Sequence, residues 1–401
     1  MKNLDKERLP AFDHLRAFLV LLGFPIHSVF CLALSRQLYR TSGPGSVEQL
    51  AQALSSAERF FLIGIYYICV FMMPAFFLLA GFFGRLSYQQ RGEVKFISNR
   101  LHRIGLPFLF CMLWSLPLYF VFFAFSHFFP NFTSEAIQSL VAKIYIINGG
   151  WWGIINQLRE TWFLYDLLWL YALTIFILKL KQYSQLSAFF LKKTDACLLV
   201  LFKSRWLYVG VALLCSLLLS QQDNLGWRTS EFTLLPSFGF LAYYGVWYGL
   251  GWWLWGHQDK FAVFFNQSRF KPLFSIFLYG VFMAWYFYHL NNDNFFNRNC
   301  GVFIYELSAA LMVLALFGGA WRSVHKSNKV LRYISSASYW LYLVQLPIIL
   351  VLLGFNYNSQ DNFFMTSIKL MIGSLVLALL SYQILVRHTW LNSIFGDKAR
   401  S

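Results

Sequence analysis

Arg16 and His27 are the residues whose types and spacing most directly suggest chemistry, and both lie in the first apolar segment, residues 11–34. An arginine in such a segment costs roughly 2.5–3.5 kcal/mol on membrane-insertion scales, so it is rarely accidental there. On a helix, eleven steps of 100° return His27 to within about 20° of the face of Arg16, roughly 16 Å further along the axis. Asp13 and Gly23 fall on this face too, three residues before Arg16 and four before His27.

One face of one predicted helix therefore carries an acid, a base, a small residue and an imidazole. An imidazole with the ordinary histidine pKa, near 6.5, can take a proton from an attacking hydroxyl, so His27 is a candidate general base. Pro25 removes a backbone hydrogen bond just before His27 and should loosen the helix there. The alternative is structural: Arg16 anchors the helix near the membrane surface, and His27 is a hydrogen-bonded core residue.

A basic stretch between Gly84 and Pro107 is the second candidate site. Arg100 and Arg103 are three residues apart at the start of the next predicted helix, so both guanidinium groups can reach one anion. Arginine suits phosphate because its planar fork donates two charge-assisted hydrogen bonds. The alternative is a cytoplasmic loop that is basic because it touches anionic lipid. The basic residues of the stretch are Arg85, Arg91, Lys95, Arg100 and Arg103, with His102 between the last two.

Three further segments place small or polar residues in apolar surroundings. Gly81, near the end of the second apolar segment, allows a close backbone approach beside the basic stretch. Trp162 and Asp166 open the fourth apolar segment, and Tyr339 and Gln345 lie in the ninth. Polar groups in membrane-spanning helices usually face the bundle interior. Each of these residues can also serve interhelical hydrogen bonding alone.

Membrane-spanning helices are the elements that must position these residues. Hydrophobic residues make up 58% of the chain, charged residues only 12% and aromatic residues 20%. Apolar runs exceed the ~20 residues that cross a bilayer, which predicts an all-α, polytopic membrane protein forming a single domain over residues 1–401. We expect about ten transmembrane helices, at residues 12–34, 62–84, 104–127, 161–179, 206–221, 233–256, 271–290, 301–321, 335–355 and 363–387.

The basic residues predict the orientation of these helices. With the N-terminus in the cytoplasm, 24 of the 33 Lys and Arg residues fall on cytoplasmic segments and 7 on the opposite side. This excess predicts that both termini are cytoplasmic. The net charge of +16 is then mostly a topology signal and does not require nucleic acid as a partner.

Several function classes lack their sequence signatures. The six cysteines show no metal-ligand spacing, so we expect neither a metal site nor a disulfide. The chain has no GxxxxGK[ST] phosphate loop, no GxGxxG, no HExxH and no GxSxG motif, which argues against an ATP-driven pump. The two halves carry no matching broken helices, which disfavours an ordinary secondary transporter. Asp13 and Arg16 interrupt the first apolar segment, so we expect it to be retained rather than cleaved as a signal peptide.

Five motifs follow one another along nearly the whole chain. They are Asp13-x-x-Arg16…His27, Phe76-Phe-Leu-Leu-Ala-Gly-Phe82, Arg100-x-x-Arg103-Ile-x-x-Pro107, Trp162-Phe-Leu-Tyr165 and Ser338-Tyr-x-x-Tyr-Leu-x-x-x-Pro347. In this order they resemble the multi-spanning membrane acyltransferase-3 family, most closely its glucans biosynthesis protein C, or glucan succinyltransferase, branch. Three features depart from the family pattern: Ala80 replaces a common serine, Gln345 an often-found histidine, and Trp162-Phe-Leu-Tyr165-Asp166 a Trp-Ser-Leu-x-x-Glu form.

The resemblance implies an enzyme of the bacterial inner membrane that moves an acyl group from cytoplasmic acyl-coenzyme A to a sugar hydroxyl at the outer face. It implies that His27 is essential and that Arg16, Arg100 and Arg103 handle coenzyme A. The predicted site then comprises His27, Arg16 and Asp13 as the catalytic group, Arg100, Arg103, Arg85 and Gly81 as the group that binds the coenzyme A donor, and Asp166, Trp162, Tyr339 and Gln345 as the substrate-binding group.

The sequence leaves the acyl group, the acceptor, the oligomeric state and the function class open. The acyl group is succinyl by analogy with the branch or acetyl by analogy with the wider family. The glycan acceptor is a periplasmic glucan, a lipopolysaccharide O-antigen or another envelope polysaccharide, and a monomer and a homo-oligomer are both compatible with the sequence. The competing class is a transporter or exporter of glycans or small anions, with His27 as a proton relay. A third class is a non-catalytic membrane scaffold.

Overall fold

The computed structural model describes ten ranges of the chain, and over these ranges it is helical, with no strands. This confirms the all-α part of the sequence prediction. The described residues are 9–41, 54–113, 161–183, 185–204, 206–220, 236–258, 270–289, 295–323, 328–356 and 362–395.

Long apolar helices dominate the described residues. Six of them are long and apolar enough to cross a membrane, and a shorter apolar helix spans Leu207–Leu219. The protein is therefore a multi-pass membrane protein. The count of ten spans and the cytoplasmic placement of the termini remain predictions. The six long segments are Pro10–Ala33, Ser56–Leu113, Trp162–Tyr183, Arg298–Arg322, Lys329–Gly354 and Phe363–Val386.

The first apolar segment is broken at the point that Pro25 predicts. Helix α1 spans Pro10–Leu21, and α2 spans Gly23–Thr41. Pro25 has no N–H for the carbonyl four residues earlier, and it is tolerated because it lies in the first turn of α2, where N–H groups need no intrahelical partner. The break places Arg16 on α1 and His27 on α2.

The basic stretch is helical and turns back on itself, which corrects its interpretation as a loop. Helix α4 spans Ser56–Arg100 and begins with a capping box between Ser55 and Glu58. Within α4, Gly92 has φ 74° and ψ 173°, a conformation that glycine adopts without strain. The chain reverses there, continues through the π-helix η1, Leu101–Gly105, and stays helical to residue 113.

The remaining helices include one that the charge pattern did not predict. Helix α9 occupies the segment after the fourth apolar run, where we expected a loop. The bounds are α8 Trp162–Tyr183, α9 Gln185–Lys203, α10 Leu207–Leu219, α11 Phe238–Trp255, α13 Lys271–His289, α14 Phe295–Arg322, α15 Lys329–Asn356, α16 Phe363–Ser381, the π-helix η5 Tyr382–Val386 and α17 Asn392–Phe395.

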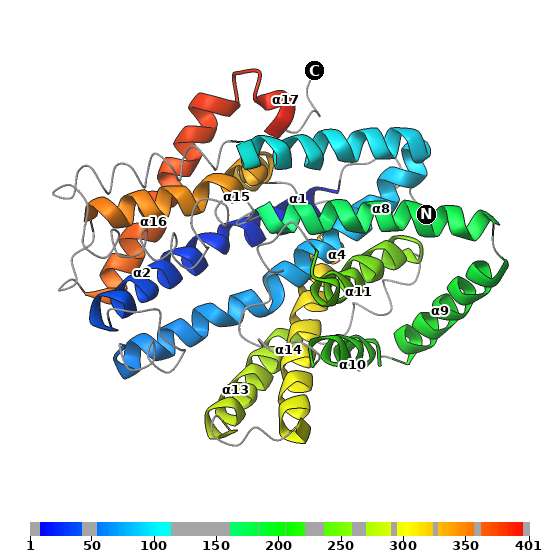
Figure 1. The fold of residues 1–401 in the computed structure, drawn as a ribbon, viewed down its shortest axis with the longest axis horizontal. Helices are drawn as coiled ribbons and strands as arrows, with labels where there is room; N and C mark the ends of the chain where they lie inside the picture. The colour runs from blue at the N-terminus through cyan, green and yellow to red at the C-terminus, as the bar shows by residue number, and fades with distance from the viewer. Residues whose placement is uncertain are drawn as a thin grey trace.

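Two groups of helices pack around α4. Helices α2, α15 and α16 contact one another and lie side by side in Figure 1, whereas α10 and α13 pack on α14. Helix α4 has its most extensive contact with α11 and also contacts both groups. Buried aromatic rings fill the junction of α1, α4 and α14, where Phe12 lies 5.1 Å from both Phe82 and Phe317, measured between ring centroids.

Glycines allow the backbones of α4 and α11 to touch. A Cβ atom on Gly81 would overlap the carbonyl oxygen of Tyr248, and one on Gly251 would overlap the carbonyl oxygen of Leu78. The close backbone approach predicted at Gly81 is therefore present, and its partner is α11. This crossing fixes the position of the second half of α4, and with it the basic stretch.

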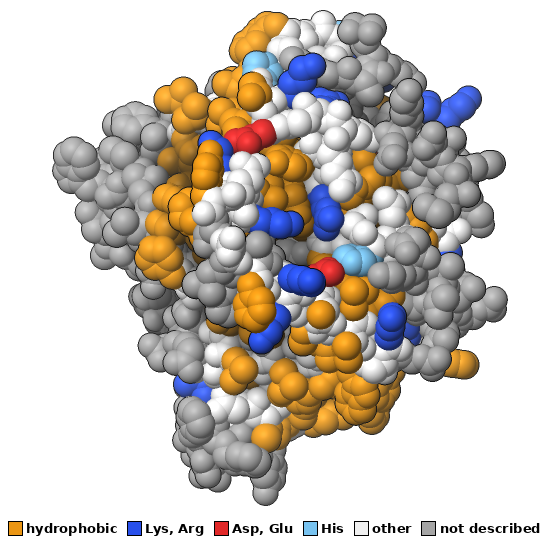
Figure 2. Space-filling view, turned by 90° about the vertical axis from the view of Figure 1, so that its right-hand side faces the viewer, with side chains coloured by type: hydrophobic (Ala, Val, Ile, Leu, Met, Phe, Trp, Pro, Cys, Tyr) orange, Lys and Arg blue, Asp and Glu red, His pale blue; other side chains and the backbone are white. Residues whose placement is uncertain are grey.

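Basic side chains gather at one end of the helices. Figure 2 views the end at which α8 passes into α9, and Lys and Arg side chains cluster on it. The charge count assigns the segments at this end to the cytoplasm. Exposed basic residues on these segments are Arg91, Lys95, Lys179, Lys181, Lys192, Lys193 and Lys203.

Candidate functional site

A pocket forms where α1, η1, α15 and α17 meet. It contains about 300 Å³ of empty space, part of which is open to solvent. Three residues that the sequence assigned to the site, Arg16, Arg103 and Tyr339, come together in its wall although they lie far apart in the chain. The complete lining is Arg16, Arg103, Ser335, Ser336, Tyr339, Ile394 and Phe395.

Arg16 is held at the pocket by α15. Its Nη2 atom donates to the carbonyl oxygen of Ser335 at 2.9 Å and to the Ser335 hydroxyl at 2.8 Å. Asp13 Oδ1 lies 3.8 Å from the same nitrogen, one helical turn earlier on α1. The predicted grouping of Asp13 with Arg16 is therefore present, and Asp13 acts there as the counter-ion of the guanidinium.

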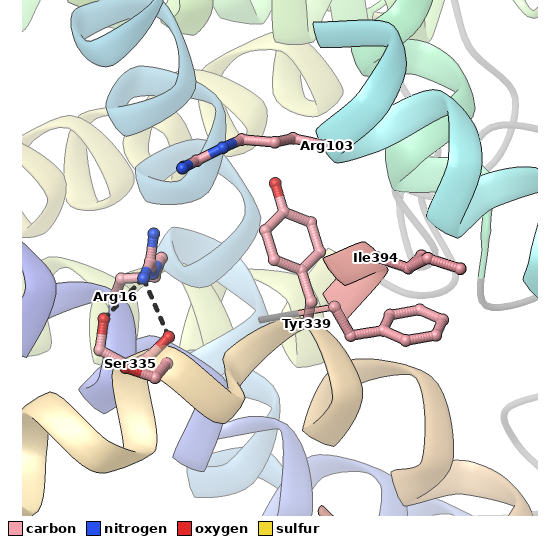
Figure 3. A pocket seen from close by; sticks show the side chains of 7 residues that line it. Arg16, Arg103, Ser335, Tyr339 and Ile394 are labelled. Carbon is pink, nitrogen blue, oxygen red and sulfur yellow. Dashed lines mark hydrogen bonds between the residues drawn. The ribbon is translucent and has the colours of Figure 1, made fainter. Parts of the chain in front are cut away.

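Arg103 and Tyr339 face the same space as Arg16. Figure 3 shows Arg16 and Arg103 extending toward the same space from α1 and η1. The Tyr339 hydroxyl points toward the Arg103 side chain. Two guanidinium groups that face one space repel each other, and an anion between them would remove that repulsion. The N–H forks and the tyrosine hydroxyl are donors suited to phosphate or carboxylate oxygens. The arrangement is therefore chemically suited to an anion.

Arg100 is not among the residues that line this pocket, so the structure does not bring Arg100 and Arg103 together there as expected. Its Nη2 atom donates to the carbonyl oxygen of Phe83 at 2.9 Å, across the turn at Gly92. The guanidinium also lies over the rings of Tyr171 and Phe96, at 4.9 Å and 5.3 Å from their centroids. Arg100 thus ties the two halves of α4 to α8.

Arg85 and Gly81 are not among the residues that line the pocket. Arg85 donates to the carbonyl oxygen of Trp252 at 3.2 Å, and its guanidinium covers Gly256 at the end of α11. Gly81 packs against the backbone of α11. In this structure both residues serve the contact between α4 and α11.

A cluster on α9 and α11 beside Arg85 escaped the sequence analysis. Asp195 accepts a hydrogen bond from Trp253 Nε1 at 2.7 Å and lies 3.3 Å from His257 Nε2. The cluster secures α9 to the end of α11. Its only sequence signal is a single acidic residue within a basic helix.

His27 lies deeper in the bundle, on α2. Its Nδ1 atom is buried and, among the described residues, has no hydrogen-bond partner. The described residues therefore supply no hydrogen bond at this atom of the kind that the structural interpretation of His27 expects. Gln345, on α15, is 3% exposed, and its carboxamide packs on Gly23, one turn before His27.

Trp162 and Asp166 lie elsewhere, on α8. The Trp162 ring packs against Tyr244 and Phe77, with centroids 5.5 Å and 6.4 Å apart. Asp166 is fully buried. A second buried carboxylate, Glu306 on α14, accepts a hydrogen bond from Tyr243 at 3.3 Å. The described contacts do not bring these acidic residues to the Arg16 pocket.

The C-terminal wall of the pocket was also missed from sequence. Ile394 and Phe395 belong to α17, which follows the last apolar span, and Phe395 is 2% exposed. Apolar residues in an otherwise polar segment were the available signal for a docked turn. Ser335, by contrast, lies in a serine-rich stretch with Ser336 and Ser338 that is visible in the sequence.

Comparison with known proteins gives one match. A family model described as an acyltransferase domain, acyltransferase-3, matches residues 9–383, nearly the whole chain. No curated protein matches, and no solved structure matches. The matched range contains Arg16, His27, Arg103 and Tyr339, and it ends before α17.

Proposed function

This chain belongs to the acyltransferase-3 family and is a membrane acyltransferase; from that membership we propose that it moves an acetyl or succinyl group from cytoplasmic acyl-coenzyme A to a hydroxyl of an envelope glycan. The proposed location is the inner membrane of a bacterium, where the lipid bilayer surrounds the helices. The observation that carries the proposal is the pocket in which Arg16, Arg103 and Tyr339 converge.

The pocket suits the phosphate groups of coenzyme A. Arg16 and Arg103 supply two planar forks for charge-assisted hydrogen bonds, and Tyr339 supplies a neutral donor. The four segments that form the pocket are all ones whose flanking charge predicts a cytoplasmic position. Acyl-coenzyme A is made in the cytoplasm, so the donor would reach the pocket without crossing the membrane.

His27 is suited to the acyl-transfer step. It follows Arg16 by eleven residues, which is roughly 16 Å of helical rise, so it lies toward the middle of the bilayer. The slender pantetheine arm of a donor anchored at Arg16 would extend along α1 and α2 toward it. There His27 would take the proton of the glycan hydroxyl as the oxygen attacks the thioester carbon. The acceptor would approach from the opposite face.

Acyl transfer by the purified protein tests the proposal. The protein is reconstituted in vesicles with isotope-labelled acetyl- or succinyl-coenzyme A outside and a glucan oligosaccharide inside, and the glycan is analysed by mass spectrometry. We expect labelled ester on the glycan with one of the two donors. Movement of unmodified oligosaccharide across the vesicle membrane, without acylation, would instead support the transporter alternative.

The same measurement in cells identifies the acceptor. Envelope glycans from cells with and without the protein are compared by mass spectrometry for a mass difference of one acyl group. The acceptor is the class of glycan that lacks the acyl group in cells without the protein. If all envelope glycans are identical in the two strains, the proposed glycan acceptor is wrong.

A further inference from the structure

Gln345, on α15, packs the end of its side chain against α2 one turn before His27. The space above Gly23 is filled by the end of the Gln345 side chain: a Cβ atom on Gly23 would lie 2.7 Å from Gln345 Oε1 and 3.1 Å from Nε2. Gly23 and His27 are four residues apart on α2, so they share a face, with about 5–6 Å between their Cβ positions.

The direction of helical side chains brings the two polar groups closer. Side chains on an α-helix lean toward its N-terminus and cover the preceding turn. The imidazole of His27 therefore leans toward the level of Gly23, where the carboxamide of Gln345 lies. The absent side chain of Gly23 leaves room for both groups.

Both groups have a buried polar atom that lacks a hydrogen bond. Within the described residues, His27 Nδ1 and Gln345 Oε1 have no partner, and neither atom is accessible to solvent. A buried polar atom without a partner destabilises the fold, so such atoms usually mark the place of a water molecule or a ligand. Two such atoms within one helical turn of α2 suggest a shared ligand with a single oxygen atom.

We propose that Gln345 and His27 together bind the hydroxyl oxygen that accepts the acyl group, which makes Gln345 a second polar residue of the transfer centre. The inference rests on the acyl transfer proposed above. The carboxamide can donate from Nε2 or accept at Oε1 by turning about its last side-chain bond. It therefore holds a water molecule before the acceptor arrives and a sugar hydroxyl afterwards.

The step balances with these two residues and the acyl-coenzyme A donor. The hydroxyl proton passes to His27 Nδ1 while Gln345 Nε2 donates a hydrogen bond to the same oxygen. The oxygen forms a bond to the thioester carbonyl carbon, and the carbon–sulfur bond breaks. Coenzyme A leaves as a thiolate, which takes the proton back from His27.

Two substitutions test the role of Gln345 from opposite sides of the contact. Gln345→Leu removes the carboxamide while keeping a side chain of similar bulk. Gly23→Ala leaves Gln345 intact but pushes its flexible end aside, because the added methyl group would meet the carboxamide. Gly64→Ala is the matched control, because a Cβ atom on this helical glycine of α4 has no atom within 4 Å.

The reconstituted variants are compared for acetyl-coenzyme A binding, for hydrolysis of acetyl-coenzyme A in water and for transfer to a glucan oligosaccharide. We expect both test variants to bind the donor like the wild type and to lose about 3–10-fold in transfer and hydrolysis, the loss of one hydrogen bond. Gly64→Ala should match the wild type in all three. A fall in donor binding equal to the fall in transfer would assign Gln345 to the donor or to the fold and overturn the inference.

The outcomes separate this inference from the proposed function. An active wild type with test variants of equal activity would remove Gln345 from the transfer centre and leave the proposed function standing. A wild type that binds acetyl- and succinyl-coenzyme A but neither hydrolyses nor transfers the acyl group would overturn both. If Gln345→Leu does not fold, Gly23→Ala decides the matter, since it retains every polar group.

Discussion

Arg16 and Ser335 are 319 residues apart in the chain, yet one guanidinium nitrogen of Arg16 donates to both the carbonyl oxygen and the hydroxyl of Ser335. The contact joins α1 to α15 at the pocket. Two acceptors on one nitrogen fix the plane of the guanidinium. The group is therefore already oriented toward Arg103 and Tyr339 before an anion binds.

Substitutions at Arg16 should weaken acyl-coenzyme A binding more than a substitution at Ser335. Arg16→Ala should weaken acyl-coenzyme A binding by roughly 10–100-fold, because a hydrogen bond to a charged group contributes about 1.5–3 kcal/mol. Arg16→Lys should restore part of the affinity, since it keeps the charge but not the planar fork. Ser335→Ala removes only the hydroxyl and keeps the carbonyl contact, so a loss of about threefold is expected. Isothermal titration in detergent measures all three, and equal losses for Ser335→Ala and Arg16→Ala would contradict this account.

Arg103 and Arg100 should separate into a binding residue and a structural residue. Arg103→Ala should weaken donor binding with little change in thermal stability. Arg100→Ala should lower the unfolding temperature, because it removes the bond to the Phe83 carbonyl and the contacts with the Tyr171 and Phe96 rings. Exposed Arg91 on the same helix provides the control, and Arg91→Ala should change neither quantity. A normal melting curve for Arg100→Ala, together with weak donor binding, would restore the paired-anion interpretation.

His27→Gln should strongly slow acyl transfer without affecting donor binding. Glutamine is polar and similar in size but does not titrate near neutrality, so the substitution tests proton transfer rather than packing. Loss of a general base typically reduces the rate by about 10²–10⁴-fold. The expected result is normal expression, normal acyl-coenzyme A affinity and a transfer rate reduced to that extent. Transfer at the wild-type rate would move the search for the base to Asp13, Asp166 and Glu306.

The crossing of α4 and α11 should tolerate no added methyl group. Gly81→Ala and Gly251→Ala each drive a Cβ atom into the backbone carbonyl of the opposite helix, which cannot move aside as a flexible side chain can. Overpacking of this kind costs about 1–3 kcal/mol or more, so thermal unfolding in detergent should shift to lower temperature. Gly249→Ala on α11 is the control, because a Cβ atom there meets nothing within 4 Å. Wild-type melting of Gly81→Ala would show that the helices separate more easily than their contact indicates.

The orientation of the helices is open to a direct test. Reporter fusions at Gln89, Gln185 and Asn328 should report the cytoplasm, because these residues lie in the segments richest in Lys and Arg. Fusions at Gly45, Asn131 and Asn358 should report the periplasm. A reversed pattern would place the Arg16 pocket on the side that lacks acyl-coenzyme A.

The sequence was informative about the first apolar segment. The break just before Pro25 could be predicted because proline lacks the N–H that an uninterrupted helix needs, although the break puts Arg16 on α1 and His27 on α2 rather than on one continuous helix. The direction of Arg100 could not, because it depends on the left-handed conformation of Gly92, which reverses the chain between Phe83 and Arg100. A glycine in a polar run is compatible with a helix, a turn or a loop, and only its packing decides among them.

Contacts between segments far apart in the chain could not be predicted from the sequence either. The sequence around Gln345 does not predict its contact with Gly23, because that contact depends on how α15 packs on α2. Helix α9 was missed for a similar reason: its basic composition was read as a topology signal, and its attachment through Asp195 to Trp253 and His257 is tertiary. Side-chain direction and long-range contact are properties of the folded chain.

Because α17 forms part of the pocket wall, the pocket is completed only late in the synthesis of the chain. Protein chains emerge from the ribosome N-terminus first, at about 5–20 residues per second, so Arg16 is made long before Ile394 and Phe395. The membrane helices can insert while the pocket still lacks one side. The pocket that we propose for the donor is therefore incomplete in a nascent chain until α17, which lies outside the range of the family match, has docked.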